Sequence, residues 1–149
     1  MLSKFFGKKS FQNEPMINSV ALVYVDAENC KTPPQKLIES ITSHFASKPM
    51  ESFAYSKWSA KSQQTKKYRE AGFRLLQADT GDNNADIMMS LDAYQRVRDL
   101  SSNGVHGNVY ICFHGDKGFT HLLEKLRSVR GWNSIWVTSS VNPNKMIEN

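Results

Sequence analysis

The run Val20-Ala-Leu-Val-Tyr-Val25, followed at once by Asp26, decides the fold class of this chain. An unbroken apolar and β-branched run, without polar residues in alternation, is typical of a strand that is buried on both faces. A second run of this kind, Val109-Tyr-Ile-Cys-Phe113, lies far along the chain. Strands buried on both faces occur in parallel sheets that helices cover on each side. The two runs therefore predict an α/β protein.

The segments between and after these runs alternate between strand and helix patterns. Thr32 before Pro33-Pro34 predicts a helix start, and that helix should end near Phe45. Further strands are expected over 51–56, 73–78 and 132–137, and further helices over 58–71, 84–100 and 117–130. Strands joined by helices of this length form right-handed βαβ units. We expect a Rossmann-like, three-layer sandwich around a mainly parallel sheet of about five strands.

Two features of individual segments add to this outline. In the helix over 84–100, one face carries Ile87, Leu91, Tyr94 and the stem of Arg98. Residues 101–108 are rich in turn formers and are expected to connect that helix to the next strand.

The chain of 149 residues has the length of a single domain. Residues 1–18 contain Lys4, Lys8 and Lys9 among three phenylalanines without a clear period, which predicts a flexible basic arm. The domain itself should cover 19–138, and 139–149 should form a polar tail.

Charge and cysteine content restrict the partners and the compartment. The net charge of +5 and the pI near 9.2 favour a polyanionic partner. Cys30 and Cys112 cannot form a disulfide framework and suit a reducing compartment. No run is apolar enough for a signal segment or for the roughly 20 residues that span a bilayer. We expect a cytoplasmic protein.

Carboxylates follow three of the predicted strands. In an open parallel sheet, ligands bind beyond the carboxyl ends of the strands. The residues at these ends are Asp26-Ala-Glu-Asn29, the segment 79–86 that ends in Asp86, and His114-Gly-Asp116. Several carboxylates close together repel one another unless a cation or a proton intervenes. Hard oxygen ligands suit Mg²⁺ or Mn²⁺, which can activate water and stabilise charge on a phosphate.

Each carboxylate also has a simpler interpretation. Asp26 after a strand is a typical residue of an Asx turn. Asp116 lies between a strand and a helix, where aspartate often caps the helix. Asp86 lies in a first helical turn, where the helix dipole favours a negative charge. The functional interpretation therefore rests on the three residues together.

Three motifs resemble those of the NYN domains, a branch of the PIN-like nucleases that includes the LabA-type bacterial proteins. Val23-Tyr-Val-Asp26-Ala-Glu-Asn29 is similar to the family's opening strand with its Asp-x-x-Asn. Gly81-Asp-Asn-Asn-Ala-Asp86-Ile-Met-Met-Ser-Leu-Asp92-Ala93 resembles its Gly-Lys-Asn-x-Ala-Asp-Ile-x-Leu-x-x-Asp-Ala stretch. His114-Gly-Asp116-Lys-Gly-Phe119-Thr-His-Leu-Leu123 resembles its Ser-x-Asp-x-Asp-Phe-Thr-x-Leu segment. The likeness covers roughly residues 20–137.

This resemblance implies a PIN-like fold and metal-dependent cleavage of RNA phosphodiesters. Asp26, Asp86 and Asp116 would be the catalytic carboxylates and the metal ligands. Asn29 would orient Asp26, the metal or its water, whereas Asp92 points elsewhere on its helix and is expected to be structural.

The chain departs from the family's pattern at one position of the third motif. The second aspartate of the family's Asp-x-Asp-Phe segment is Gly118 here, with Lys117 before it. Asp82 or Glu28 could restore the missing carboxylate as a metal ligand, and Lys117 could pair with Asp116 or bind a substrate phosphate.

A basic segment between residues 57 and 69 is the candidate nucleic-acid surface. Its predicted contacts are Lys57, Trp58, Lys61, Lys66 and Lys67, together with Lys117 from the third motif. Lysines bind phosphates without sequence preference, and aromatic rings can stack on unpaired bases. The alternative is a solvated helix face with the rings of Trp58 and Tyr68 buried.

Three functions remain open at this point. The first is a metal-dependent endoribonuclease acting on RNA. The second is a weakly active or inactive NYN module that binds RNA or a protein, which Gly118 favours. The third is a phosphoryl-transfer domain, such as a receiver or a dehalogenase-like phosphatase, since both place an aspartate after the first strand. The sequence also leaves open whether the protein is a homodimer.

Overall fold

The computed structural model describes residues 19–45, 49, 51–78, 84–113, 119–138 and 147–148. The helices are α1 (Pro34–Phe45), α2 (Gln63–Glu70), α3 (Asn84–Ser102) and α4 (Thr120–Arg127). The strands are β1 (Ser19–Asp26), β2 (Glu51–Ser56), β3 (Arg74–Gln77), β4 (His106–Phe113), β5 (Trp132–Thr138) and β6 (Ile147–Glu148).

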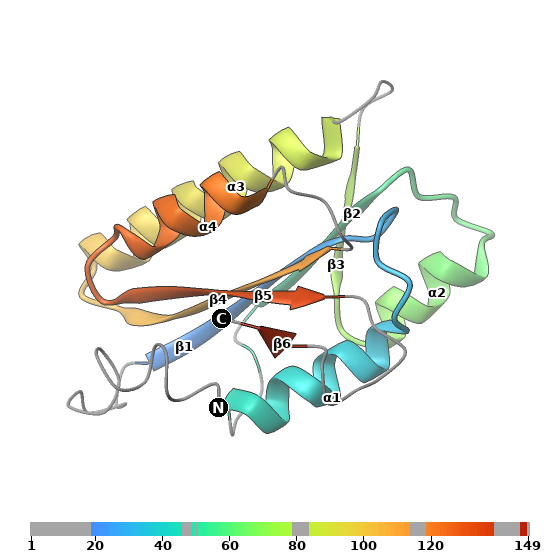
Figure 1. Cartoon of the computed structure of the whole chain (residues 1–149). Coiled ribbons are helices and arrows are strands. Elements are labelled where there is room, and N and C mark those ends of the chain that lie inside the picture. Colours follow the sequence, from blue (N-terminus) through green and yellow to red (C-terminus); the bar gives the residue numbers. More distant parts are fainter. Residues whose placement is uncertain are drawn as a thin grey trace.

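The strands form one sheet in the order β3-β2-β1-β4-β5-β6. β1 to β5 are parallel, and β6 pairs antiparallel with β5 at the edge (Figure 1). This arrangement confirms the predicted α/β fold with a mainly parallel sheet. The added strand β6 lies within the segment that the sequence predicted to be a polar tail, so the sheet extends one strand further than expected.

Helices cover both faces of the sheet, α1 and α2 on one side and α3 and α4 on the other (Figure 1). Alternate residues of β1 therefore enter two cores. Leu22 and Tyr24 join the core with α3 and α4, whereas Val23 and Val25 join the core with α1. The double burial explains why the opening run contains no polar residue.

Helix α2 is shorter than the sequence predicted, because it begins at Gln63 instead of residue 58. The Ser62 side chain accepts a hydrogen bond from the Thr65 backbone N–H at 3.0 Å, which fixes the helix start. Lys57, Trp58 and Lys61 consequently precede the helix.

The connection between α3 and β4 also differs from the prediction. α3 continues to Ser102, and Gly104 follows with a φ of +78°. The Val105 N–H reaches back to the Leu100 carbonyl at 3.0 Å, as in a Schellman motif. β4 then starts at His106, inside the predicted connector. The turn at Gly104 thus connects α3 to β4 in fewer residues than the predicted connector over 101–108.

The predicted apolar face of α3 exists, but it is turned away from the core. The helix buries Ala85, Met89 and Ala93 against the sheet. Ile87 is 57% exposed and Leu91 is 67% exposed. Val97 and Leu100 continue the buried face, so of the predicted apolar face it is Ile87 and Leu91 that lie open to solvent.

Candidate metal and nucleic-acid site

Asp26 is the last residue of β1, which lies in the interior of the sheet. The chain turns directly after it. The Ala27 N–H donates to the Tyr55 carbonyl at 3.0 Å, and the Asn29 N–H donates to the Asp26 carbonyl at 3.1 Å. These two bonds hold the carboxylate of Asp26 at the carboxyl end of the sheet, the edge at which parallel sheets bind ligands.

The Asp26 carboxylate is buried, with only 1% of the residue exposed. The Asn29 side-chain amide donates a hydrogen bond to Asp26 Oδ2 at 2.8 Å. Among the described residues, Asp26 Oδ1 is buried and has no hydrogen-bond partner. Burial of a carboxylate oxygen without a partner is costly, and a bound cation would compensate that cost. The chemistry of Asp26 therefore fits a divalent metal ligand.

Asp86 lies in the first turn of α3 and is half-buried. Glu28, between Asp26 and Asn29 in the turn, is exposed. Asp82, Asp116, Lys117 and Gly118 lie outside the described residues. Within the described ranges, no three acidic, histidine or cysteine side chains gather into a metal-binding group. The meeting of Asp26, Asp86 and Asp116 at one site therefore stays a prediction.

The lysines of the basic segment are exposed. Lys57 and Lys61 lie in the loop after β2, and Lys66 and Lys67 lie on α2. All four side chains are accessible to the phosphates of a nucleic acid, and such contacts bind its backbone without sequence preference.

Of the two aromatic residues of this segment, Tyr68 belongs to the core and Trp58 packs against it as a partly buried residue. Tyr68 is 2% exposed, and its ring meets the Trp58 ring edge-on at a centroid distance of 5.2 Å. The Trp58 indole N–H donates to the Leu76 carbonyl at 3.0 Å. Trp58 is half-buried in this position. Tyr68 is thus buried, as in the alternative interpretation, and a contact of the half-buried Trp58 with nucleic acid stays a prediction.

Gln64 connects α2 to the Asp26 turn, a contact that the sequence analysis missed. Its side-chain amide donates to the Ala27 carbonyl at 3.3 Å. The basic segment therefore lies beside the carboxyl end of β1. The only sequence signal was the position of Gln64 two residues after the Ser62 cap, which places it in the first turn of α2.

Asp92 is engaged with the sheet, in agreement with the expected structural role. The Tyr55 hydroxyl donates to Asp92 Oδ2 at 2.7 Å. Burial and this hydrogen bond raise the pKa of Tyr55 well above its usual value. One turn further along α3, Arg96 forms a bidentate ion pair with Glu51, with N–O distances of 2.8 and 3.0 Å. These contacts attach α3 to β2, the strand whose Tyr55 carbonyl also binds the Asp26 turn.

Cys30 and Cys112 are both buried and free. Burial raises the pKa of the Cys30 thiol to about 11 and raises that of Cys112 as well. Thiols held in the protonated form are poor nucleophiles. Cys30, although close in sequence to Asp26, is therefore not suited to be a catalytic nucleophile.

The fold defines a class: α/β proteins with a central, mainly parallel sheet flanked by helices, consistent with a PIN-like fold. Residues 20–148 match the family model of the NYN domain, and the chain belongs to this family. A comparison with curated proteins finds no significant match. None of the described helices is both long enough and apolar enough to cross a membrane.

Proposed function

We propose that this NYN domain is a metal-dependent endoribonuclease. The observation that carries the proposal is the Asp26 carboxylate, which is buried at the carboxyl end of β1 and whose Oδ1 has no partner among the described residues. A carboxylate placed in this way is suited to bind Mg²⁺ or Mn²⁺. Membership of the NYN family supports a phosphodiester of RNA as the substrate.

Asp26 would hold the ion through Oδ1, with Asp86 and Asp116 as further ligands and Asp82 or Glu28 as candidates for the remaining negative charge. When bound, the ion supplies an activated water and stabilises the charge that develops on the phosphate. Asn29 restricts the Asp26 carboxylate to one orientation through its 2.8 Å hydrogen bond. The chain's own contribution is thus to hold a fixed, dehydrated oxygen ligand ready for the metal.

The RNA backbone would lie along the exposed lysines of the loop after β2 and of α2. Gln64 supports this path, because it fixes α2 against the turn that carries Asp26. The proposed contacts are Lys57, Lys61, Lys66 and Lys67, with Lys117 from the third motif. Since Tyr68 is buried and Trp58 is packed against it, charge rather than stacking would provide the affinity.

A second candidate is an NYN module that binds RNA or a protein with little or no cleavage. Gly118 favours it, because a glycine stands where the family's motif has its second aspartate. Both candidates use the same fold and differ only in the chemistry at the acidic edge.

Incubation of the protein with labelled single-stranded RNA and Mn²⁺ distinguishes the two. We expect cleavage that EDTA abolishes and that Asp26→Asn and Asp86→Asn each reduce by about a hundredfold or more. Asp99→Asn is the matched control, because Asp99 is an exposed carboxylate of α3 that accepts a hydrogen bond from Gln95. Binding of RNA without cleavage, unchanged by EDTA, would support the binding module instead.

We also propose a reducing compartment, the cytoplasm, as the site of action. The observation that supports it is that Cys30 and Cys112 are free thiols buried in the core on the α1 side of the sheet.

A further inference from the structure

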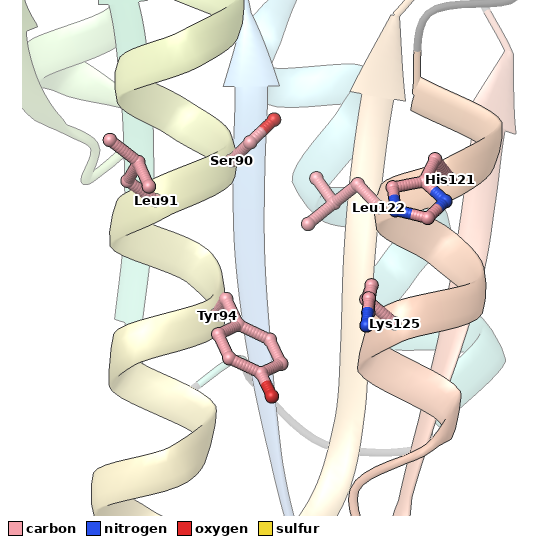
Figure 2. A pocket seen from close by; sticks show the side chains of 6 residues that line it. All are labelled: Ser90, Leu91, Tyr94, His121, Leu122 and Lys125. Atoms are coloured by element: carbon pink, nitrogen blue, oxygen red, sulfur yellow. The ribbon is translucent and has the colours of Figure 1, made fainter.

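A groove runs between α3 and α4 on the outer side of the helical layer. It encloses a volume of about 310 Å³ and is lined by Ser90, Leu91, Tyr94, His121, Leu122 and Lys125. Figure 2 shows Tyr94 of α3 and Leu122 of α4 reaching into the space between the two helices. We refer to these six residues as the α3–α4 groove.

The groove borders two exposed aliphatic side chains. Ile87 and Leu91 are separated by one helical turn and are 57% and 67% exposed. Among the described residues they are the large hydrophobic side chains left open to solvent. Two adjacent aliphatic residues beside an apolar groove are typical of a surface that receives the apolar face of a helix.

The described rim of the groove is basic. Lys125 and His121 of α4 line the groove, and the exposed Arg98 of α3 places its guanidinium over the ring of Tyr94, another lining residue. Two carboxylates of α3 have partners of their own, since Asp92 accepts a hydrogen bond from Tyr55 and Asp99 accepts one from Gln95. An occupant with acidic groups along its flanks would therefore be attracted to the groove.

We propose that the α3–α4 groove binds an acidic amphipathic helix of a partner protein. The apolar face of that helix would cover Leu91 and Ile87, and its flanking Asp or Glu residues would pair with Arg98 and Lys125. The binding needs no metal and no RNA cleavage, so it stands apart from the proposed nuclease function.

The charges and the aromatic geometry disfavour the other occupants. A second copy would bring two basic rims together on chains that each carry a net charge of +5. Residues 1–18 of the same chain are basic as well. RNA phosphates could contact only the cations and would leave the exposed aliphatic side chains of Ile87 and Leu91 uncovered.

The first test uses two fluorescent helical peptides with the same leucine face, one with Glu and the other with Lys on both flanks. Full-length protein should bind the Glu peptide about tenfold more tightly than the Lys peptide, measured by fluorescence anisotropy. Leu91→Ser should lower the affinity for the Glu peptide about tenfold, because the peptide loses its contact with an aliphatic side chain. Lys125→Glu combined with Arg98→Glu should reverse the preference between the peptides.

Gln95→Ala is the matched control, because Gln95 is an exposed residue of the same helix whose side chain bonds to Asp99. It should bind both peptides as the parent does. Equal binding of the two peptides, or Glu-peptide binding that Leu91→Ser leaves unchanged, would overturn the proposal. The proposal would also be overturned if the protein did not bind the Glu peptide but bound RNA with an affinity that Leu91→Ser lowers.

A second test replaces Leu91 with a photo-crosslinking phenylalanine derivative in the full chain. Irradiation with the Glu peptide should give a peptide adduct. A crosslink to a second copy or to residues 1–18 would assign the groove to that occupant if it formed equally in the presence of the Glu peptide. That result would overturn the proposal.

Discussion

The Asn29 side-chain amide donates to Asp26 Oδ2 at 2.8 Å, while the buried Oδ1 of the same carboxylate has no hydrogen-bond partner within the part of the chain that the structure describes. One oxygen is thus fixed by the protein while the other is available to a ligand. The relationship is local, because both residues belong to a single turn after β1.

Asn29→Ala should therefore lower the affinity for Mn²⁺ by about tenfold, since residues that orient a ligand typically contribute this much. A titration followed by electron paramagnetic resonance measures the affinity. Asn103→Ala is the control, because the Asn103 amide also donates to an oxygen, the Asp99 carbonyl, but lies at the end of α3. Equal affinities of Asn29→Ala and the parent protein would show that Asn29 does not orient the ligand.

Tyr55→Phe should reduce the free energy of unfolding by about 1–3 kcal/mol, because it leaves the Asp92 carboxylate without its 2.7 Å hydrogen bond. Urea unfolding measures the change. Tyr94→Phe is the matched control, since its hydroxyl lies 3.5 Å from the Arg98 side chain at an exposed position. A smaller loss for Tyr55→Phe than for Tyr94→Phe would contradict the assigned role of the Tyr55–Asp92 pair.

His44 should make stability depend on pH below neutrality. Burial lowers the pKa of His44 from 6.5, and the ring lies 2.7 Å from the Tyr110 hydroxyl. As pH falls, His44 is therefore protonated in the unfolded chain before it is protonated in the folded protein. Its contribution to the free energy of unfolding is complete above pH 6.5 and is lost as pH falls from there through the lowered pKa of the folded state. In His44→Gln the decrease in the urea midpoint between neutral and acidic pH should be smaller. An unchanged decrease would mean that His44 contributes nothing to it.

The basic segment should determine how RNA binding depends on salt. Lys61→Ala and Lys66→Ala should each reduce the slope of log K against log salt by about 0.7, the value for one contact to a single strand. Arg130→Ala is the control, because this exposed residue lies before the first residue of β5, whereas the proposed site lies at the carboxyl end of β1. Slopes that change equally in all three variants would argue against a phosphate path along α2.

The sequence predicted the sheet well because β1 and β4 are buried on both faces, which leaves an unmistakable pattern of apolar residues. It failed where one tertiary contact decides the outcome. The spacing of Ile87 and Leu91 shows that they share a face of α3, but only the packing of Ala85, Met89 and Ala93 shows that the opposite face is buried.

The candidate site was predictable in part for the same reason. A carboxylate after a buried strand identifies Asp26, and the Asp-x-x-Asn spacing brings Asn29 to it. The Gln64 contact with the Ala27 carbonyl depends on how α2 returns to the sheet, and no local pattern encodes that. Burial of Tyr68 likewise follows from its contacts with Trp58 and Phe73, not from the basic composition around it.

The central claim is that Asp26 is a metal ligand, and a crystal soaked in Mn²⁺ tests it most directly. Anomalous scattering should place an ion against Asp26 Oδ1 at a distance of about 2.0–2.3 Å, and Asp26→Asn should abolish that peak. Ordered crystals in which Mn²⁺ occupies other sites, while Asp26 Oδ1 remains without an ion, would contradict the claim.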